Sequence, residues 1–313
     1  MDTVNTVAAK EGFAEFKSAK LSTLGFFMAL PPVLVIIVFV GLPIVVAFLF
    51  SIGYTEGPNR VISIIGQDVY SKDSWWGTSA AYLDVFKDPR FWPDFRLTLF
   101  VTFFSTFVVL VMALGMGLYQ RIKGGRVASI LSLLALVPLF VPVVIAAYAI
   151  ANFYNGVGFV RTFMAQFGID FPVITSTRNA IVIGTIWTSL PFAILMITSG
   201  LQSVPNALIE SAQDAGASFM RIVRTIMIPL AFVPIVIAGT FTSIGIMGSF
   251  TVPLFLGPNQ PTLLGVEISN FFTAYNRPQQ SIVMAFVIFA AASGIAVLYI
   301  WANIRSAKQS GRI

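Results

Sequence analysis

The charged residues whose spacing could support a specific chemical role are gathered between positions 203 and 229. Glu210 and Asp214 are four residues apart, so a helix places both carboxylates on one face. Arg221 and Arg224 follow among apolar residues. Carboxylates, guanidinium groups and apolar side chains in one short segment suit the binding of a protein partner. The chain has neither histidine nor cysteine, which excludes disulfides, thiolate chemistry, Cys/His zinc sites and histidine-based triads.

Local signals in this segment predict two short helices. Ser203 and Pro205 indicate a helix start, a cap followed by a proline in the first turn. Residues 206–215 are strong helix formers, and Gly216 interrupts them where the chain needs a positive φ or a tight approach. A second helix is expected over Ser218–Met227.

The second helix is expected to present a mixed surface. Phe219, Ile222 and Ile226 fall on one side of it, the two arginines lie toward the other, and Pro229 ends the segment. A solvated loop needs no such face, whereas a docking element does. The alternative is an ordinary helical hairpin whose glycine merely turns the chain.

Composition indicates that this element is attached to a membrane protein. Of the 313 residues, 57% are hydrophobic and only 10% are charged, against about 25% charged in soluble domains. Six uncharged intervals each exceed the roughly 18–20 residues that a membrane-spanning helix needs. The predicted class is therefore all-α, with a transmembrane domain over 24–304 and six helices near 24–51, 97–119, 128–153, 180–200, 229–251 and 280–303. No carboxylate falls inside these cores.

Basic residues give the orientation. Eleven of the 19 lysines and arginines lie in the segments that one side of the membrane would share. By the positive-inside rule this side is the cytoplasm. The N-terminal segment 1–23, the loop 203–229 and the tail 305–313 are thus expected to be cytoplasmic. We interpret the net charge of +6 as topology, not as nucleic-acid binding.

The segment 54–96 is expected to lie on the outer side. Its aromatic residues are typical of an interfacial belt with short amphipathic helices: Trp75, Trp76, Tyr82, Phe86, Phe91 and Trp92. Two interpretations stay open, anchoring in lipid and a landing surface for an external solute-binding protein.

The 203–229 loop also resembles a known family signature. Its pattern is Glu210-Ser211-Ala212, three residues, Gly216, nine residues, Ile226-Met227-Ile228-Pro229. This is similar to the EAA signature of binding-protein-dependent ABC importer permeases, from which it departs at Ser211 and Ile228. The resemblance implies the type I, MetI-like permease fold, with six helices and the signature between the fourth and the fifth. It implies a multi-pass protein of the bacterial inner membrane.

The resemblance assigns the segment to docking on an ATPase subunit. It implies that Glu210 pairs with a basic group there, that Gly216 permits the turn, and that Ala212 and Ala215 keep the contact close. The remaining expected docking residues are Ser211, Asp214, Phe219 and Arg221. The implied partners are two ATPase subunits, a second and paralogous permease subunit, and an external solute-binding protein. ATP and Mg would be bound by the ATPase subunits, so no cofactor, metal or catalytic residue is expected here. The sequence contains no GxxxxGK[S/T] motif, so we expect no ATP hydrolysis by this chain itself.

Polar residues inside the predicted spans are candidates for the solute path, because polar groups facing lipid are costly. They are Asn152, Tyr154, Trp187, Thr188, Thr240, Ser243 and Met247. Close helix packing is the alternative for each of them. The outer connection with Phe250, Pro253, Gly257, Pro258 and Gly265 resembles the polyamine and related organic-solute branch, which we slightly favour over the sugar branch. Against a polycation, the predicted spans lack carboxylates.

Two other functions remain open. An ion-coupled secondary carrier usually has charged residues inside its spans, and here the predicted cores contain none. A non-transporting membrane subunit that only recruits a cytoplasmic partner would also use a docking loop.

Overall fold

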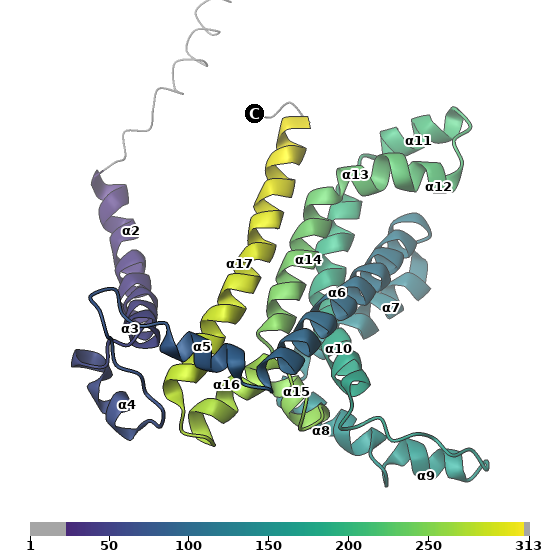
Figure 1. The fold of residues 1–313 in the computed structure, drawn as a ribbon. Helices are drawn as coiled ribbons and strands as arrows, with labels where there is room; N and C mark the ends of the chain where they lie inside the picture. Colours follow the sequence, from purple (N-terminus) through teal and green to yellow (C-terminus); the bar gives the residue numbers. More distant parts are fainter. Residues whose placement is uncertain (1–22, 310–313) are drawn as a thin grey trace, which may run out of the picture.

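The computed structural model describes residues 23–309, and the regular elements in that range are all helices (Figure 1). In chain order they are α2 (Thr23–Ile36), the π-helix η1 (Ile37–Gly41), α3 (Leu42–Ser51), the 3-10 turn η2 (Gly57–Asn59), α4 (Arg60–Ile65), α5 (Ala80–Lys87), α6 (Phe91–Ile122), α7 (Gly125–Leu136), the 3-10 turn η3 (Val137–Phe140), α8 (Val143–Tyr154), α9 (Phe159–Ala165), α10 (Arg178–Gln202), α11 (Asn206–Asp214), α12 (Phe219–Ile222), the π-helix η4 (Val223–Met227), α13 (Ile228–Leu230), α14 (Phe232–Met247), α15 (Thr251–Leu256), α16 (Leu264–Thr273) and α17 (Pro278–Gln309).

Five segments of the described chain are long and apolar enough to cross a membrane, and a sixth is obtained if one bent pair is counted as a single span. The five are Met28–Ser51, Phe91–Ile122, Val143–Ala165, Arg178–Gln202 and Pro278–Trp301. The pair consists of Phe219–Leu230 and Phe232–Met247, bent by 69°. The predicted all-α membrane class is confirmed.

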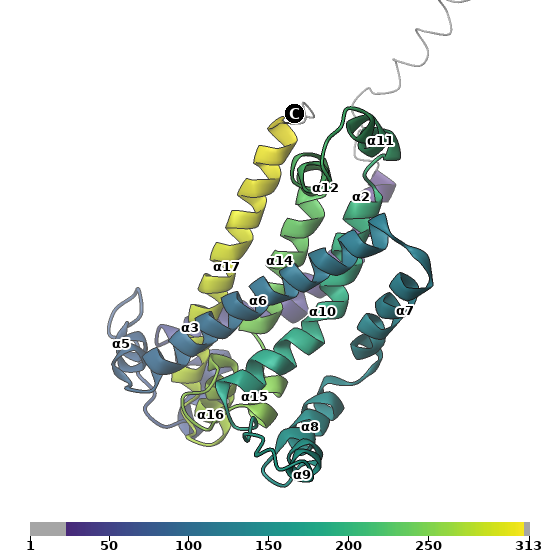
Figure 2. The same cartoon turned by 90° about the vertical axis from the view of Figure 1, so that its right-hand side faces the viewer.

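The third predicted span, 128–153, is not one helix. It is divided into α7, η3 and α8, which follow one another down the same side of the molecule (Figure 2). Pro138 and Pro142 explain the break, because proline lacks the N–H that continues a helix. The apolar segment Val143–Ala165 reaches a spanning length only by combining α8 with α9, between which the chain leaves helical geometry.

The centre of the bundle is formed by α6, α10 and α14, which cross side by side in both views (Figures 1 and 2). Small hydroxyl residues allow close approach and bond the helices together. Thr185 donates to Ser105 at 3.0 Å, and Ser243 donates to Thr106 at 3.1 Å, so α6 is joined to both of its neighbours.

Helix α6 begins six residues before the predicted core and thereby includes Asp94, whose side chain is buried. One carboxylate oxygen accepts the backbone N–H of Thr262 at 2.8 Å. A turn later, the Thr98 hydroxyl accepts the N–H of Leu264 at 2.9 Å. The span therefore contains a carboxylate that lies outside the predicted core. This carboxylate holds the segment leading into α16.

The two ends of the described chain lie at the same end of the molecule. The start of α2, the end of α17 and the α11–α12 element all lie at the top of Figure 1, while α4, α5 and α16 lie toward the bottom. Of the expected cytoplasmic segments, residues 1–22 and 310–313 lie outside the described range. The expected tail from position 305 begins within α17, which continues to Gln309.

Candidate docking element and solute passage

Helix α11 begins differently from the prediction. Its N-terminal capping position is Pro205, without a side-chain cap. Ser203, the predicted cap, follows the end of α10, and its hydroxyl donates back to the carbonyl of Gly200 at 2.8 Å. The proline already has the extended backbone that precedes a helix, so a serine cap two residues earlier is not needed.

The glycine turn after α11 is built as predicted. Gly216 has a φ of +76°, which costs a residue with a Cβ atom about 1 kcal/mol or more. The N–H of Gly216 donates to the carbonyl of Gln213 at 2.8 Å, and that of Ala217 donates to Ala212 at 2.9 Å. These two bonds form a Schellman motif, which closes the C-terminus of a helix. Space around the missing Cβ atom is open, so the backbone angle alone requires glycine.

The second helix of the predicted docking element is shorter than expected. It is α-helical only over Phe219–Ile222 and continues as the π-helix η4 and then α13. The expected apolar face is divided, since Phe219 is 53% exposed while Ile222 is buried and Ile226 packs against the core. Tertiary packing causes the difference, because η4 lies against α6 and α10.

The docking residues predicted from the sequence lie together on the protruding element. No residue of α11 is buried. Exposed side chains belong to Glu210, Ser211, Asp214, Ala215, Phe219 and Arg221, and Ala212 is half-buried. Beneath them lies a cavity of about 240 Å³, whose lining includes Glu210, Phe219 and, from the end of α6, Arg121. The arrangement offers an acidic group and an exposed aromatic ring beside a recess, which suits insertion into a partner surface.

The predicted solute-path residues fall into two groups. Asn152 is exposed on α8, where its amide donates to Tyr148, and Tyr154 is half-buried at the end of the same helix. The other five lie on α10 and α14. Trp187 and Thr188 are half-buried, whereas Thr240, Ser243 and Met247 are buried. For Ser243, its bond to Thr106 of α6 favours the packing alternative.

A different set of residues forms a cavity between α10 and α14. It measures about 260 Å³ and is lined by Ser189, Phe192, Phe241, Thr242 and Gly245. The two phenylalanine rings lie with their centroids 6.0 Å apart. The Thr242 hydroxyl is buried and has no hydrogen-bond partner among the described residues. The sequence contained a signal for this cavity in the 189/192 and 241/245 spacings, which place each pair on one helical face.

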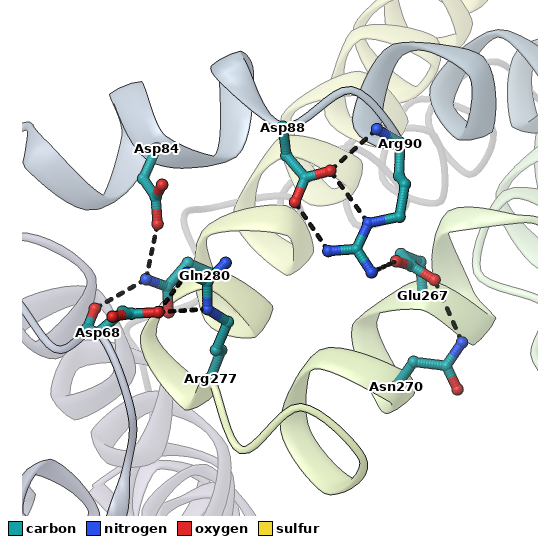
Figure 3. Close-up of polar contacts among 8 residues, drawn as sticks. All are labelled: Asp68, Asp84, Asp88, Arg90, Glu267, Asn270, Arg277 and Gln280. Carbon is teal, nitrogen blue, oxygen red and sulfur yellow. Dashed lines mark hydrogen bonds and ion pairs between the residues drawn. The ribbon is translucent and has the colours of Figure 1, made fainter.

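The segment 54–96 is held by two polar groups, which Figure 3 shows. In the first, Arg277 pairs with Asp68, and the Gln280 amide donates to Asp84 at 2.9 Å. In the second, Arg90 pairs with Asp88 at 2.9 Å.

Arg90 connects the start of α6 with α16. A terminal nitrogen of its guanidinium lies 3.7 Å from Glu267, a buried carboxylate that also accepts from Asn270 at 3.2 Å. Burial alone would raise the pKa of Asp88, but hydrogen bonds from the Arg90 side chain and backbone outweigh it and lower that pKa. The second group therefore stabilises the ionised carboxylate.

The predicted aromatic belt is divided in the same region. Trp75 and Trp76 are about 70% exposed and stack with their ring centroids 3.4 Å apart. Phe91, by contrast, is 1% exposed and packs with Phe271 of α16 and other buried residues. Phe91 is therefore a core residue, not a member of a belt, because α16 covers it.

Comparison with known proteins identifies the family of this all-helical membrane bundle. The family model described as "Binding-protein-dependent transport system inner membrane component" matches residues 76–310, more than half of the chain. The chain belongs to this family. It is a multi-pass membrane protein and a permease component of an ABC importer.

Relatives with known roles transport different solutes. The trehalose/maltose transport system permease protein MalF of Thermococcus litoralis is 27% identical over 84% of this chain and 85% of its own length. The spermidine/putrescine transport system permease protein PotB of Escherichia coli is 27% identical over 57% of this chain and 66% of its own length. Among solved structures, a bacterial ABC transporter that imports alginate aligns with a TM-score of 0.70 at 17% identity, over 91% of this chain and 95% of that one. This last likeness concerns the fold.

Proposed function

We propose that this chain forms the translocation path for a small hydrophilic organic solute and is driven by separate ATPase subunits that bind α11 and α12. The observation that carries the proposal is the Gly216 turn, which presents Glu210 and Phe219 on an element that protrudes from the bundle. The chain would work with two ATPase subunits, a paralogous second permease subunit and an external solute-binding protein. It would have no enzymatic activity of its own.

The same proposal sets the orientation in a bacterial inner membrane. The docking element faces the cytoplasm, and the described start of α2 and end of α17 lie at that end of the molecule. Both termini are then cytoplasmic. The outer segment with Trp75 and Trp76 faces the binding protein or the lipid headgroups.

The cavity between α10 and α14 supports one solute class over the other. Its lining combines two phenylalanine rings with the hydroxyl-bearing residues Ser189 and Thr242 and contains no charged residue. Aromatic faces and hydroxyl groups suit a neutral polyhydroxylated solute, whereas a polycation would be better held by carboxylates. We therefore propose a sugar-like solute, in place of the polyamine that the outer connection favours.

Co-purification tests the docking proposal. The tagged full-length chain is purified from its native host in mild detergent, and bound ATPase is measured for Gly216→Val and Gly125→Val. Both glycines have φ near +80° and open space around the missing Cβ atom, so the two changes impose similar strain. We expect only the Gly216 variant to lose the ATPase. Retention of the ATPase by both variants, or its absence from the unmodified chain, would overturn the proposal.

Competition tests the solute class. In proteoliposomes that contain the complete complex, the ATP-driven uptake of a radiolabelled solute is measured. Unlabelled sugars or unlabelled polyamines are added as competitors. Inhibition by a neutral sugar supports the proposal. Inhibition by spermidine or putrescine alone would show that the polyamine class is the right one.

A further inference from the structure

Helix α11 is attached to the bundle by few contacts. It buries no residue of its own, although its half-buried Ile209 and Ala212 touch the core formed by α6, α10 and α14. Within residues 23–309, the side-chain hydrogen bond that reaches α11 from another helix comes from Arg121, in the last turn of α6. The polar part of the attachment therefore depends on this one guanidinium.

Arg121 also holds the chain that leads into α11. Its Nε donates to the carbonyl of Leu201, in the last turn of α10, at 3.1 Å. A terminal nitrogen donates to the carbonyl of Val204, in the link, at 2.9 Å. The same nitrogen donates to the side-chain amide oxygen of Asn206, the first residue of α11. One side chain thus joins three successive parts of the chain.

Helix capping explains only part of this arrangement. The last carbonyls of a helix lack partners, and a cation near them is favourable, which accounts for the bond to Leu201. Val204 and Asn206 lie beyond the end of α10, so their bonds instead fix the direction in which the chain leaves that helix.

The helices around Arg121 approach one another closely. One turn earlier on α6, a Cβ atom on Gly117 would lie 2.9 Å from Leu201. On the other side of α10, a Cβ atom on Gly200 would lie 2.6 Å from Pro234 of α14. Tightly packed elements transmit displacement because they cannot deform continuously.

We propose that Arg121 is the positioning residue that couples the docking helix to the membrane helices. It holds α11 at a fixed angle to α6 and α10, so that a displacement of α11 by the ATPase moves these helices and is not absorbed by the link at 203–205. This inference rests on the proposed docking function of α11. It requires the fork of an arginine, because the three acceptors are reached from two nitrogens, Nε and a terminal nitrogen, whereas a lysine ammonium has only one.

The experiment uses the complete complex, with ATPase subunits and binding protein, in proteoliposomes. Arg121→Gln, Arg121→Lys and Asn206→Leu are compared with Lys123→Gln. The control removes one positive charge from the same connection, and the Lys123 side chain has no hydrogen bond or ion pair among the described residues. For each variant we would measure bound ATPase, ATP hydrolysis and uptake of a radiolabelled neutral disaccharide.

We expect Arg121→Gln to keep its ATPase but to move roughly tenfold less solute per ATP hydrolysed, within the range seen when coupling residues are changed. Arg121→Lys should recover little of that ratio, Asn206→Leu should lower it less, and Lys123→Gln should leave it unchanged. If Arg121 were merely structural, the yield of complex and both rates would fall in parallel at a constant ratio. That result would overturn the inference, and so would normal coupling in both the Arg121→Gln and Asn206→Leu variants.

The two proposals fail in different ways. If the unmodified chain binds no ATPase, or Gly216→Val keeps it, the docking proposal itself is wrong. If Gly216→Val loses the ATPase while the Arg121 variants remain fully coupled, docking stands and only the role of Arg121 is overturned.

Discussion

Arg277 is paired with Asp68, 209 positions earlier in the chain, with its Nε 2.6 Å from the carboxylate. Neighbouring contacts extend this link, since the Asn276 amide donates to the carbonyl of Ile65 at 2.6 Å. The Gln280 amide donates to the carbonyl of Asp68 at 2.8 Å. Residues 276–280, at the start of α17 and just before it, therefore hold the segment 54–96 in place.

Removing the ion pair should loosen that segment without unfolding the bundle. Because both side chains are partly exposed, we expect Asp68→Asn to cost up to about 1 kcal/mol. Amide hydrogen exchange over residues 66–78 should become faster. The Arg161–Asp170 pair, whose aspartate is 85% exposed, provides the control. Unchanged exchange in Asp68→Asn, or an equal effect of Asp170→Asn, would contradict the assignment.

The Asp88–Arg90 pair gives a pH dependence of known sign. The folded pKa of Asp88 is lowered despite its burial, so the folded state binds fewer protons than the unfolded state below neutrality. The contribution of this pair to stability should be complete above about pH 4, the ordinary value for aspartate, and be lost as the pH falls through the lower folded pKa.

Substitution of Arg90 should raise the pH at which this contribution to stability is lost. In Arg90→Gln the hydrogen bonds of the guanidinium are gone and the burial of Asp88 remains, so protonation should begin at a higher pH. Thermal unfolding in detergent between pH 3 and pH 7, for the two proteins side by side, measures the effect. Identical pH profiles would show that Arg90 does not set the pKa of Asp88.

Position 200 should require glycine, because a neighbouring helix lies too close for a larger side chain. In Gly200→Ala the new methyl group would lie 2.6 Å from Pro234, so α10 and α14 must separate. We expect a loss of about 1–3 kcal/mol, measured by thermal unfolding. Gly115→Ala on α6 meets open space and should be neutral or slightly stabilising. Equal stabilities of the two variants would refute the close approach.

The cavity between α10 and α14 predicts which hydroxyl contacts the solute. Ser189→Ala removes the hydroxyl of a half-buried residue that lines the cavity, and should weaken the apparent affinity about tenfold, near the value of one good hydrogen bond. Thr188→Val is the control, because its hydroxyl already donates to carbonyls of its own helix. A larger effect at Thr188 would favour the path predicted from the sequence over the cavity.

Much of the architecture could be predicted because hydrophobic length and charge position are local properties. The apolar runs correspond to helical segments of the structure, and Gly216 marks the turn that its spacing from Glu210 indicates. The break at Pro138 was missed because membrane helices tolerate proline, so the residue type alone does not decide between a kink and an end.

Contacts between distant residues account for what the sequence could not show. In the sequence, Arg121 resembles a basic residue that only sets the orientation of the chain in the membrane. The fold brings it to Leu201, 80 positions later. Phe91 resembles an interfacial aromatic until Phe271 covers it. The predicted solute-path residues remain predictions, and burial of Thr240 and Met247 agrees better with helix packing.

The absence of buried residues from α11 has a consequence for how such a protein can evolve. A substitution on an exposed face seldom changes folding stability by more than about 0.5 kcal/mol, and α11 is exposed or half-buried throughout. Apart from Asn206, its surface can therefore change while the bundle stays intact, which under the proposed docking function would let it match a different ATPase. The Gly216 turn and the buried η4 residues Val223 and Met227 have no such freedom.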